Sequence, residues 1–321
     1  MRIVFMGTPE FAVPSLEMLI KEGYNIVGVI TQTDKPKGRG ERLCCPPVKE
    51  VALKNNLNVL QPDSVKTQEF LEQLKTLKPD VMITVAYGKI LPQQVLDIPV
   101  YGTVNVHASL LPLLRGAAPI HHALINGFTV TGITTMMTDR GMDTGDILLS
   151  EEIPVHDRMN VGELHDILAE LGAKVLKETL EKLNEGTLKR IPQDHSKATY
   201  APMVDKETGR IDWNKPAIDI HNRIRGVTPW PGAYTFYEGK RMKLIQSYYT
   251  DRITDAEPGT LLEITKDYIE IAANPGTVMI YEIQFENCRC MPIGVCGHNL
   301  EKGIVLKPYG NNSKGGVSCV L

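Results

Sequence analysis

Hydrophobic and polar positions in the first part of the chain follow the pattern of a parallel α/β sheet. An apolar run at residues 2–6 ends at Gly7, an amphipathic helical pattern follows, and a β-branched apolar run covers residues 25–30. Residues 80–86 are typical of a strand buried on both faces, and residues 103–107 form a fourth run that ends on polar residues. This strand–helix–strand opening predicts a parallel sheet covered by helices.

The pattern changes in the second part of the chain. Residues 133–137 and 146–153 predict a pair of strands, and residues 161–183 predict a long amphipathic helix. Residues 190–207 are polar, contain turn-forming residues and show no periodicity, which indicates a linker along the surface. From Arg210 onward, short apolar runs punctuated by Gly and Pro predict a small antiparallel barrel. We therefore expect an α/β domain over 1–189, a linker over 190–207, a β-barrel domain over 208–310 and a flexible tail over 311–321.

Composition and charge exclude several classes of protein. The chain has 321 residues, of which 42% are hydrophobic and 23% charged, as in soluble globular proteins with two domains. Its net charge of −3 argues against a general polycation, so any nucleic-acid contact must come from a local patch. No apolar leader or membrane-spanning run is visible, and six cysteines do not form a disulfide framework in a chain this long. We expect a cytoplasmic protein with reduced thiols and no membrane partner.

Basic residues gather in two segments. Residues 33–47 combine Lys35, Lys37, Arg39 and Arg42 with glycines and prolines. The first third of the predicted barrel contains seven cations, namely Arg210, Lys215, Arg223, Arg225, Lys240, Arg241 and Lys243. Each cluster fits an ordinary solvated surface, and each also fits a patch that contacts phosphates.

The candidate chemistry lies between residues 105 and 146. Asn105 and His107 are two positions apart at the end of a predicted strand, so they point to the same side, where parallel sheets bind ligands. Asp143 lies in a glycine-bounded turn between two strands. An amide, an imidazole and a carboxylate suit acyl transfer to an amine, because Asn105 and protonated His107 can stabilise an oxyanion and Asp143 can hold the imidazolium or relay a proton. Taken singly, the histidine also fits a surface group and the aspartate ordinary turn chemistry.

A family resemblance adds to this pattern. NVHASLLPLLRGAAPI, followed by GITTMMTDRGMDTGDIL, resembles the signature of the formyltetrahydrofolate-dependent formyltransferases. The similarity runs from IVFMGTPEFAVPSL to GHNLEKGIVL, and within the family the chain resembles the members that formylate methionyl initiator tRNA. The resemblance implies a Rossmann-like formyltransferase domain with a mostly parallel sheet, plus a C-terminal OB-like β-barrel. It also implies catalytic roles for Asn105, His107 and Asp143, and a folate-binding loop formed by Ser109, Leu110, Leu111 and Pro112.

The resemblance also implies the substrates. The donor would be 10-formyltetrahydrofolate, without a metal, and the acceptor initiator methionyl-tRNA, for translation initiation; we expect a monomer. The predicted tRNA contacts are Lys37, Arg39, Arg42 and Arg241. The chain departs from the family pattern at Leu113-Leu114, where a basic or aromatic pair is common, and at Cys288 and Cys290, where basic residues are usual.

Other interpretations stay open at this level. A folate-dependent hydrolase, or a formyltransferase acting on a small-molecule amine, would use the same chemistry. An inactive RNA-binding protein is disfavoured by the complete set of three polar residues. A zinc site at Cys288, Cys290, Cys296 and His298 is disfavoured because the C-x-C spacing differs from the usual zinc knuckle. A dinucleotide site is disfavoured because only Gly7 of the required glycines follows the first strand.

Overall fold

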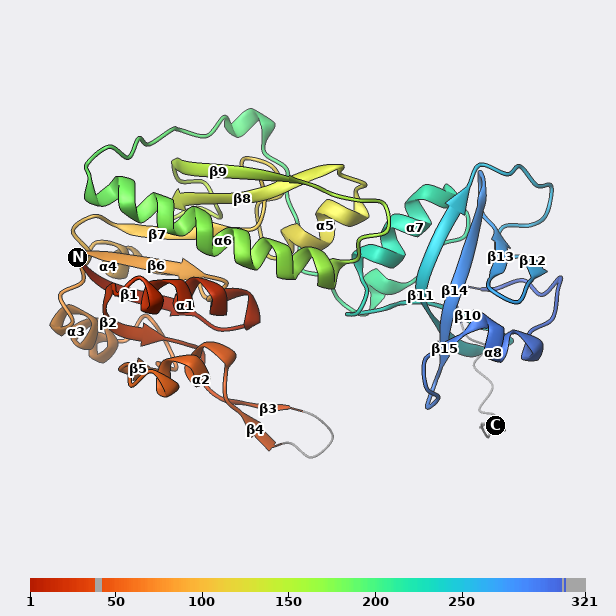
Figure 1. The fold of residues 1–321 in the computed structure, drawn as a ribbon, viewed down its shortest axis with the longest axis horizontal. Coiled ribbons are helices and arrows are strands. Elements are labelled where there is room, and N and C mark those ends of the chain that lie inside the picture. The colour runs from red at the N-terminus through yellow and green to blue at the C-terminus, as the bar shows by residue number, and fades with distance from the viewer. Residues whose placement is uncertain (38–41, 308, 310–321) are drawn as a thin grey trace. The chain divides into compact units, whose positions relative to one another are not determined.

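The computed structural model describes residues 1–37, 42–307 and 309, and it divides into two compact units (Figure 1). The first unit comprises Met1–Pro119, Val130–Pro154 and His165–Ala201. The second comprises Ile120–Thr129, Val155–Leu164 and the described part of the chain from Pro202 onward. The first part of the predicted linker thus belongs to the first unit, while the domain bounds expected from the sequence remain a prediction.

A mostly parallel sheet forms the centre of the first unit. Its strands are β1 (Arg2–Gly7), β2 (Asn25–Ile30), β5 (Val59–Leu60), β6 (Val81–Val85), β7 (Thr103–His107), β8 (Val130–Met137) and β9 (Ile147–Pro154). The described residues pair in the order β5-β2-β1-β6-β7-β8-β9, in which the first five strands are parallel. The last two are antiparallel additions at one edge. Strands β2 and β7 have the bounds that the sequence predicted.

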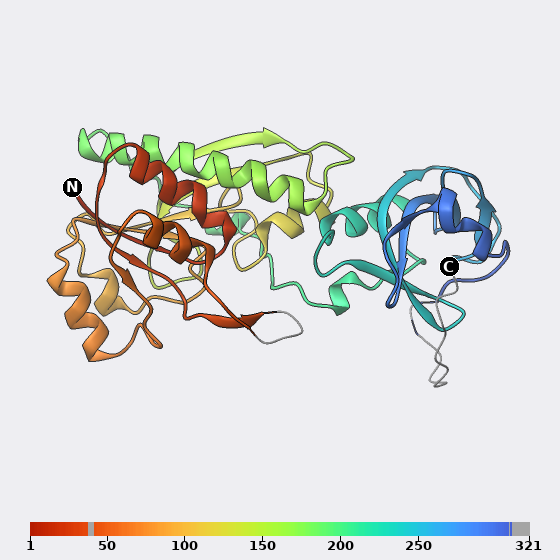
Figure 2. The same cartoon turned by 60° about the horizontal axis from the view of Figure 1, so that its bottom comes forward.

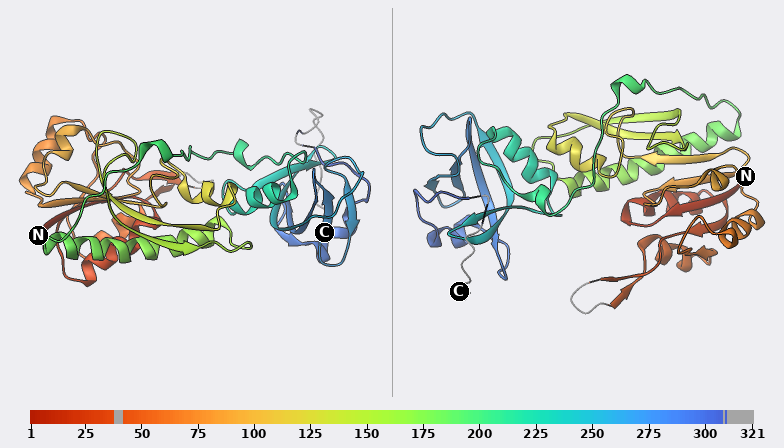
Figure 3. Two further views of the ribbon diagram at one scale, coloured as in Figure 1. Left: turned by 90° about the horizontal axis from the view of Figure 1, so that it is seen from above. Right: turned by 180° about the vertical axis from the view of Figure 1, so that it is seen from behind.

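Helices cover both faces of this sheet. They are α1 (Val13–Lys21), α2 (Pro47–Lys54), α3 (Gln68–Thr76), α4 (Gln93–Leu96), α5 (Pro119–Ile125) and α6 (Val161–Asn184), of which α5 and α6 run across the division between the units. Figures 2 and 3 show α1 and α6 on one face, with α3 and α4 on the other. On the α3 side, Val4, Met6 and Met82 form a core with Phe70 and Leu74. Because side chains alternate along a strand, one apolar run supplies the cores on both faces.

A two-stranded hairpin follows β2. Its strands are β3 (Lys35–Lys37) and β4 (Arg42–Cys44), which pair in antiparallel register. Lys37 and Arg42 are partners in this register, at the end of the two strands that adjoins residues 38–41. Arg39 lies outside the described residues.

The second unit is a small helix followed by an antiparallel barrel. Its elements are α7 (Ala217–Gly226), β10 (Ala233–Tyr237), β11 (Lys240–Thr250), β12 (Leu261–Ile264), β13 (Ile269–Ala272), β14 (Thr277–Phe285), β15 (Met291–Pro292) and α8 (Ile293–Cys296). The described strands pair in the order β10-β11-β14-β13-β12, with β15 on β14. Residues 303–307 bond to Leu261 at one edge and to Phe236 at the other, which closes the barrel (Figure 2). The predicted fold class is confirmed.

Several features differ from or extend the sequence-based expectation. The periodic analysis had no prediction for α7, whose apolar residues Ile220 and Ile224 pack into the barrel core. Cys44, Cys45, Cys290 and Cys296 are free thiols. In the described part of the chain, no helix is long and apolar enough to cross a membrane.

Candidate active site

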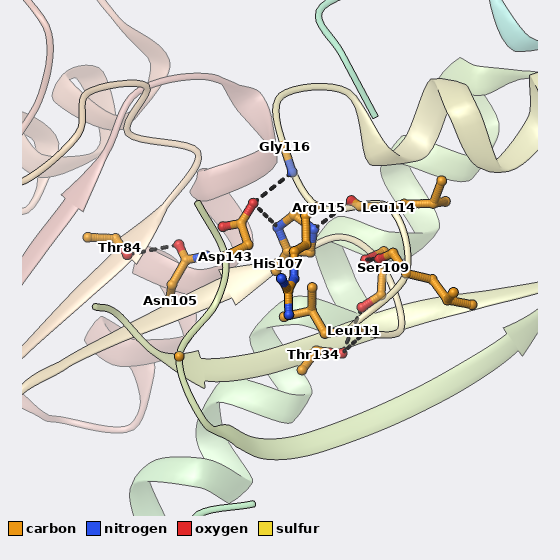
Figure 4. Close-up of polar contacts among 12 residues, drawn as sticks. Thr84, Asn105, His107, Ser109, Leu111, Leu114, Arg115, Gly116, Thr134 and Asp143 are labelled. Carbon is orange, nitrogen blue, oxygen red and sulfur yellow. Dashed lines mark hydrogen bonds and ion pairs between the residues drawn. The ribbon is translucent and has the colours of Figure 1, made fainter. Parts of the chain in front are cut away.

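Strand β7 presents two of the predicted polar residues at its carboxyl end (Figure 4). The amide oxygen Oδ1 of Asn105 accepts a hydrogen bond of 2.8 Å from the hydroxyl of Thr84 on the neighbouring strand β6. This bond fixes which end of the amide is the acceptor. The Nδ2 group makes no hydrogen bond to any described residue, so it is available as a donor to a ligand.

His107 is almost completely buried, with 6% of its surface exposed, and both ring nitrogens face oxygen acceptors. Nε2 lies 3.0 Å from the carbonyl oxygen of Leu114, and Nδ1 lies 3.7 Å from Oδ2 of Asp143. A neutral imidazole carries one N–H and could satisfy only one of these acceptors. Both ring nitrogens of His107 are therefore directed at oxygen atoms, one on the backbone and one on the Asp143 carboxylate.

Asp143 comes from the loop that connects β8 to β9, and it approaches His107 from outside the strand (Figure 4). Its Oδ2 atom also accepts a hydrogen bond of 2.8 Å from the backbone N–H of Gly116. Its backbone has a φ of 54°, in the left-handed region that aspartate tolerates better than most residues. In the same loop, the carboxylate of Asp139 accepts hydrogen bonds from Gly141 and Thr144. The Asp143 carboxylate thus has a fixed place beside the His107 imidazole.

The predicted folate loop folds over the end of β7 and is tied to β8. The hydroxyl of Ser109 donates to the carbonyl oxygen of Leu113 at 2.6 Å. The hydroxyl of Thr134 donates to the carbonyl oxygen of Ser109 at 2.7 Å and accepts from the N–H of Leu111 at 3.1 Å. Ser109 and Leu111 are buried, whereas Leu110 and Pro112 are half-buried. These hydrogen bonds hold the loop in place, and its half-buried positions are those able to contact a ligand.

The segment between Ile191 and Ala201 holds parts of the candidate active site in place, although its lack of periodicity had indicated only a surface linker. Ile191 pairs with Ile147 at the start of β9. Gln193 donates to backbone oxygens of the Asp143 loop, and Thr199 Oγ1 accepts from the N–H of Leu114 at 2.9 Å. The predicted surface linker is therefore, in its first part, a support for the site. Thr84, Gln193 and Thr199 were missed because nothing in their local sequence marks them.

The predicted tRNA contacts lie in other parts of the structure. Lys37 and Arg42 are on the β3–β4 hairpin, whose base is anchored by ion pairing of Asp34 with Lys49 at 2.8 Å. A hydrogen bond from Gln61, followed by that from Lys49, lowers the pKa of Asp34 and keeps it ionised. Lys49 is thus engaged at the hairpin base.

Arg241 belongs to the second unit, on β11. Its guanidinium carbon lies 3.8 Å from the centre of the Tyr234 ring, within cation–π distance. Other cations of the predicted basic segment have structural partners. Arg225 is buried and donates to the carbonyl oxygen of His156, and Arg210 pairs with Glu207 at 3.3 Å. Fewer cations of this basic segment are therefore available for phosphate contacts than its sequence suggests.

The zinc site that the sequence analysis disfavoured, at Cys288, Cys290, Cys296 and His298, is not found as a cluster of metal ligands among the described residues. Across the ranges that the structure describes, no group of three or more histidine, cysteine or acidic side chains gathers in a metal-binding arrangement.

Comparisons with known proteins agree with this architecture. Residues 1–180 match the formyl transferase family, and residues 203–298 match the formyl transferase C-terminal domain. A relative named methionyl-tRNA formyltransferase from Acetivibrio thermocellus is 58% identical over 309 residues, covering 95% of this chain and 99% of that protein. Another of that name, from Ruminiclostridium cellulolyticum, is 52% identical over 307 residues, covering 94% and 98%.

Solved structures share the fold at lower identity. A sugar 3N-formyl transferase, WlaRD, crystallised with dTDP and 5-N-formyl-THF, has a TM-score of 0.67 at 18% identity and covers 90% of this chain and 99% of its own. HypX from Aquifex aeolicus, in complex with tetrahydrofolic acid, has a TM-score of 0.60 at 19% identity and covers 92% of this chain and 46% of its own. The two family matches and the near-full-length relatives show that the chain belongs to the formyl transferase family.

Proposed function

We propose that this chain transfers the formyl group of 10-formyltetrahydrofolate to the free amino group of methionyl initiator tRNA, for translation initiation. The observation that carries the proposal is identity of 58% over 95% of the chain to a relative named methionyl-tRNA formyltransferase. The arrangement of Asn105, His107 and Asp143 supports the same chemistry independently, because it provides hydrogen-bond donors and a proton acceptor without a nucleophilic serine or cysteine.

The reaction can be assigned to these three residues. The methionyl amine attacks the formyl carbon, and the carbonyl oxygen gains negative charge. The Nδ2 group of Asn105 donates a hydrogen bond to that oxygen, and the imidazolium of His107 adds positive charge beside it. Asp143 stabilises the imidazolium and accepts, directly or through water, the proton that the amine loses. The bond from the formyl carbon to N10 of the folate then breaks, and N10 takes up, directly or through water, the proton that Asp143 accepted, as tetrahydrofolate leaves.

The folate donor is assigned to the loop of Ser109, Leu110, Leu111 and Pro112. Hydrogen bonds of Ser109 and Leu111 with Thr134 hold the loop against β8. A preformed loop favours a flat, partly apolar ligand because little conformational entropy is lost on binding. The half-buried Leu110 and Pro112 would provide the apolar contacts.

The tRNA acceptor is assigned to two basic regions. The proposed contacts on the first unit are Lys37, Arg39 and Arg42, of which Lys37 and Arg42 pair in the β3–β4 hairpin, and the ion pair of Asp34 with Lys49 lies at the base of that hairpin. Arg241 lies on the barrel, where its guanidinium stacks on Tyr234. Phosphate contacts by arginine and lysine release counterions and so give salt-dependent binding. We further propose a cytoplasmic monomer.

A substrate panel tests the proposed function. The purified protein is incubated with 10-formyltetrahydrofolate and, in parallel, with methionyl initiator tRNA, a dTDP-linked amino sugar, or buffer alone. We expect a formylated product only with the tRNA and little tetrahydrofolate release in buffer. Preferred formylation of the amino sugar would favour the small-molecule enzyme, and equal release of tetrahydrofolate in all three reactions would favour a hydrolase. RNA binding without any turnover would indicate an inactive binding protein.

A further inference from the structure

Arg115 is an unusual residue for the interior of a protein. It is only 2% exposed, yet its guanidinium forms no ion pair with any described carboxylate. Its Nε and Nη2 atoms instead donate to the amide oxygen of Gln193 at 3.2 and 2.6 Å, and Nη2 also lies 3.0 Å from Nδ1 of His195. Burying a positive charge with only neutral partners costs stability. Such a cost points to a role other than holding the fold together.

Gln193 transmits this contact to the Asp143 loop. While its amide oxygen accepts from Arg115, its Nε2 group donates to the carbonyl oxygens of Asp143 and Gly145 at 2.9 and 2.7 Å. Both ends of the amide are therefore engaged, which fixes its orientation. The loop it supports holds Asp143 at a positive φ, and a backbone in that region persists only where its surroundings determine it.

The backbone around Arg115 binds the same two candidate catalytic residues. On one side of it, the carbonyl oxygen of Leu114 lies 3.0 Å from Nε2 of His107. On the other side, the N–H of Gly116 donates to Oδ2 of Asp143 at 2.8 Å. The contacts therefore form a closed ring, from His107 through residues 114–116 and Gln193 to Asp143, and back to His107. Figure 4 shows the contacts of His107 with Leu114 and Asp143, and that of Asp143 with Gly116.

We propose that Arg115 and Gln193 are positioning residues, which set the distance between His107 and Asp143 during formyl transfer. This inference rests on the proposed function. Neither residue needs to touch a substrate. The Arg115 side chain bonds to Gln193, and Gln193 bonds to the loop that carries Asp143. Arg115 therefore links that loop to residues 114–116, which contact His107. A displacement of about 1 Å at a reacting geometry can reduce turnover by about a hundredfold.

The substitution Gln193→Glu separates the two halves of the ring. A carboxylate keeps an oxygen acceptor for the buried Arg115 and adds a compensating charge, so the fold should survive. It cannot donate to the backbone oxygens of Asp143 and Gly145 and repels them. We expect kcat to fall by about 10- to 100-fold, with KM for both substrates changed by less than about threefold. The matched control is Gln73→Glu on the exposed surface of α3, which should leave kcat unchanged.

A double-substitution cycle distinguishes positioning from a general structural role. If Gln193 acts through Asp143, then Gln193→Glu should cost less than about threefold in kcat once Asp143→Asn is present. An equal loss in both backgrounds would overturn the inference, as would unchanged kcat in Gln193→Glu, or a loss of kcat that follows only from a lowered Tm. Wild-type protein that fails to formylate methionyl-tRNA would overturn the proposed function and this inference with it. Active wild type beside an equally active Gln193→Glu would overturn only the inference.

Discussion

Replacing Asp143 with asparagine removes a negative charge 3.7 Å from Nδ1 of His107 while keeping the side chain nearly the same size. At an effective dielectric constant of about 20, two unit charges at that separation attract by about 4 kcal/mol. Asp143 retains 19% side-chain exposure, so solvent screens part of this attraction. Because each 1.4 kcal/mol corresponds to a tenfold change in rate, we expect Asp143→Asn to lower kcat by about 10²- to 10³-fold.

The fold should tolerate this substitution. The introduced amide oxygen can still accept the hydrogen bond that Gly116 donates, so the loop keeps its anchor. The introduced amide still faces Nδ1 of His107 but carries no negative charge. The expected result is a loss of catalysis with a change in Tm of less than about 4 °C, the shift that about 1 kcal/mol causes in a domain of this size.

The assay is steady-state formylation of methionyl initiator tRNA, with kcat and KM measured for both substrates. Asp139→Asn is the matched control, because that carboxylate belongs to the same loop but, among the described residues, accepts hydrogen bonds from Gly141 and Thr144 alone. We expect Asp139→Asn to keep kcat within about fivefold of wild type, since it loses at most one exposed hydrogen bond. Retention of a third or more of kcat by Asp143→Asn, or equal losses in the two variants, would refute the charge-based reasoning.

Three further outcomes follow from the structure. Thr84→Val should lower kcat about tenfold without affecting tRNA binding, because it removes the hydrogen bond that orients Asn105; an unchanged kcat would argue against that role. Burial lowers the pKa of His221, so as the pH falls below about 6.5 the unfolded chain binds more protons than the folded one, and the free energy of unfolding should decrease. On the same acidification, the Tm of His221→Gln should fall less than that of the wild type. Arg42→Ala should reduce the ratio of kcat/KM for initiator tRNA to kcat/KM for elongator tRNA; an unchanged ratio would show that the hairpin does not discriminate between the two tRNAs. Arg241→Glu should instead weaken binding of any tRNA and make that binding less dependent on salt.

The positions of several strands along the chain could be predicted because apolar runs mark them directly. The alternation at residues 103–107 placed Asn105 and His107 on one side of a strand end, and the structure has that strand with the same bounds. The two-domain class followed from the change of pattern after the long helix. Helix α7 was not foreseen because its few apolar residues, Ile220 and Ile224 among them, stand between polar ones in a segment rich in turn signals.

The support of the site could not be predicted, since it depends on how distant segments meet. Gln193 and Thr199 lie in a stretch without periodicity, and their importance appears only once that stretch packs against residues 114–116. Arg115 is a cation that composition alone would assign to the surface, whereas the fold buries it. The basic segment of the barrel was misread in the same way at Arg225, whose guanidinium bonds to backbone carbonyls.

Single-turnover formyl transfer tests the central claim most directly. Enzyme in excess is mixed with methionyl initiator tRNA and 10-formyltetrahydrofolate, and formylmethionyl-tRNA and tetrahydrofolate are quantified over time. The account predicts that both products appear in equal amounts at one rate in the wild-type protein. In His107→Ala and Asn105→Ala, that rate should fall by about two to four orders of magnitude while tRNA binding is retained. Near-normal rates in either variant, or tetrahydrofolate released without formylated tRNA, would contradict it.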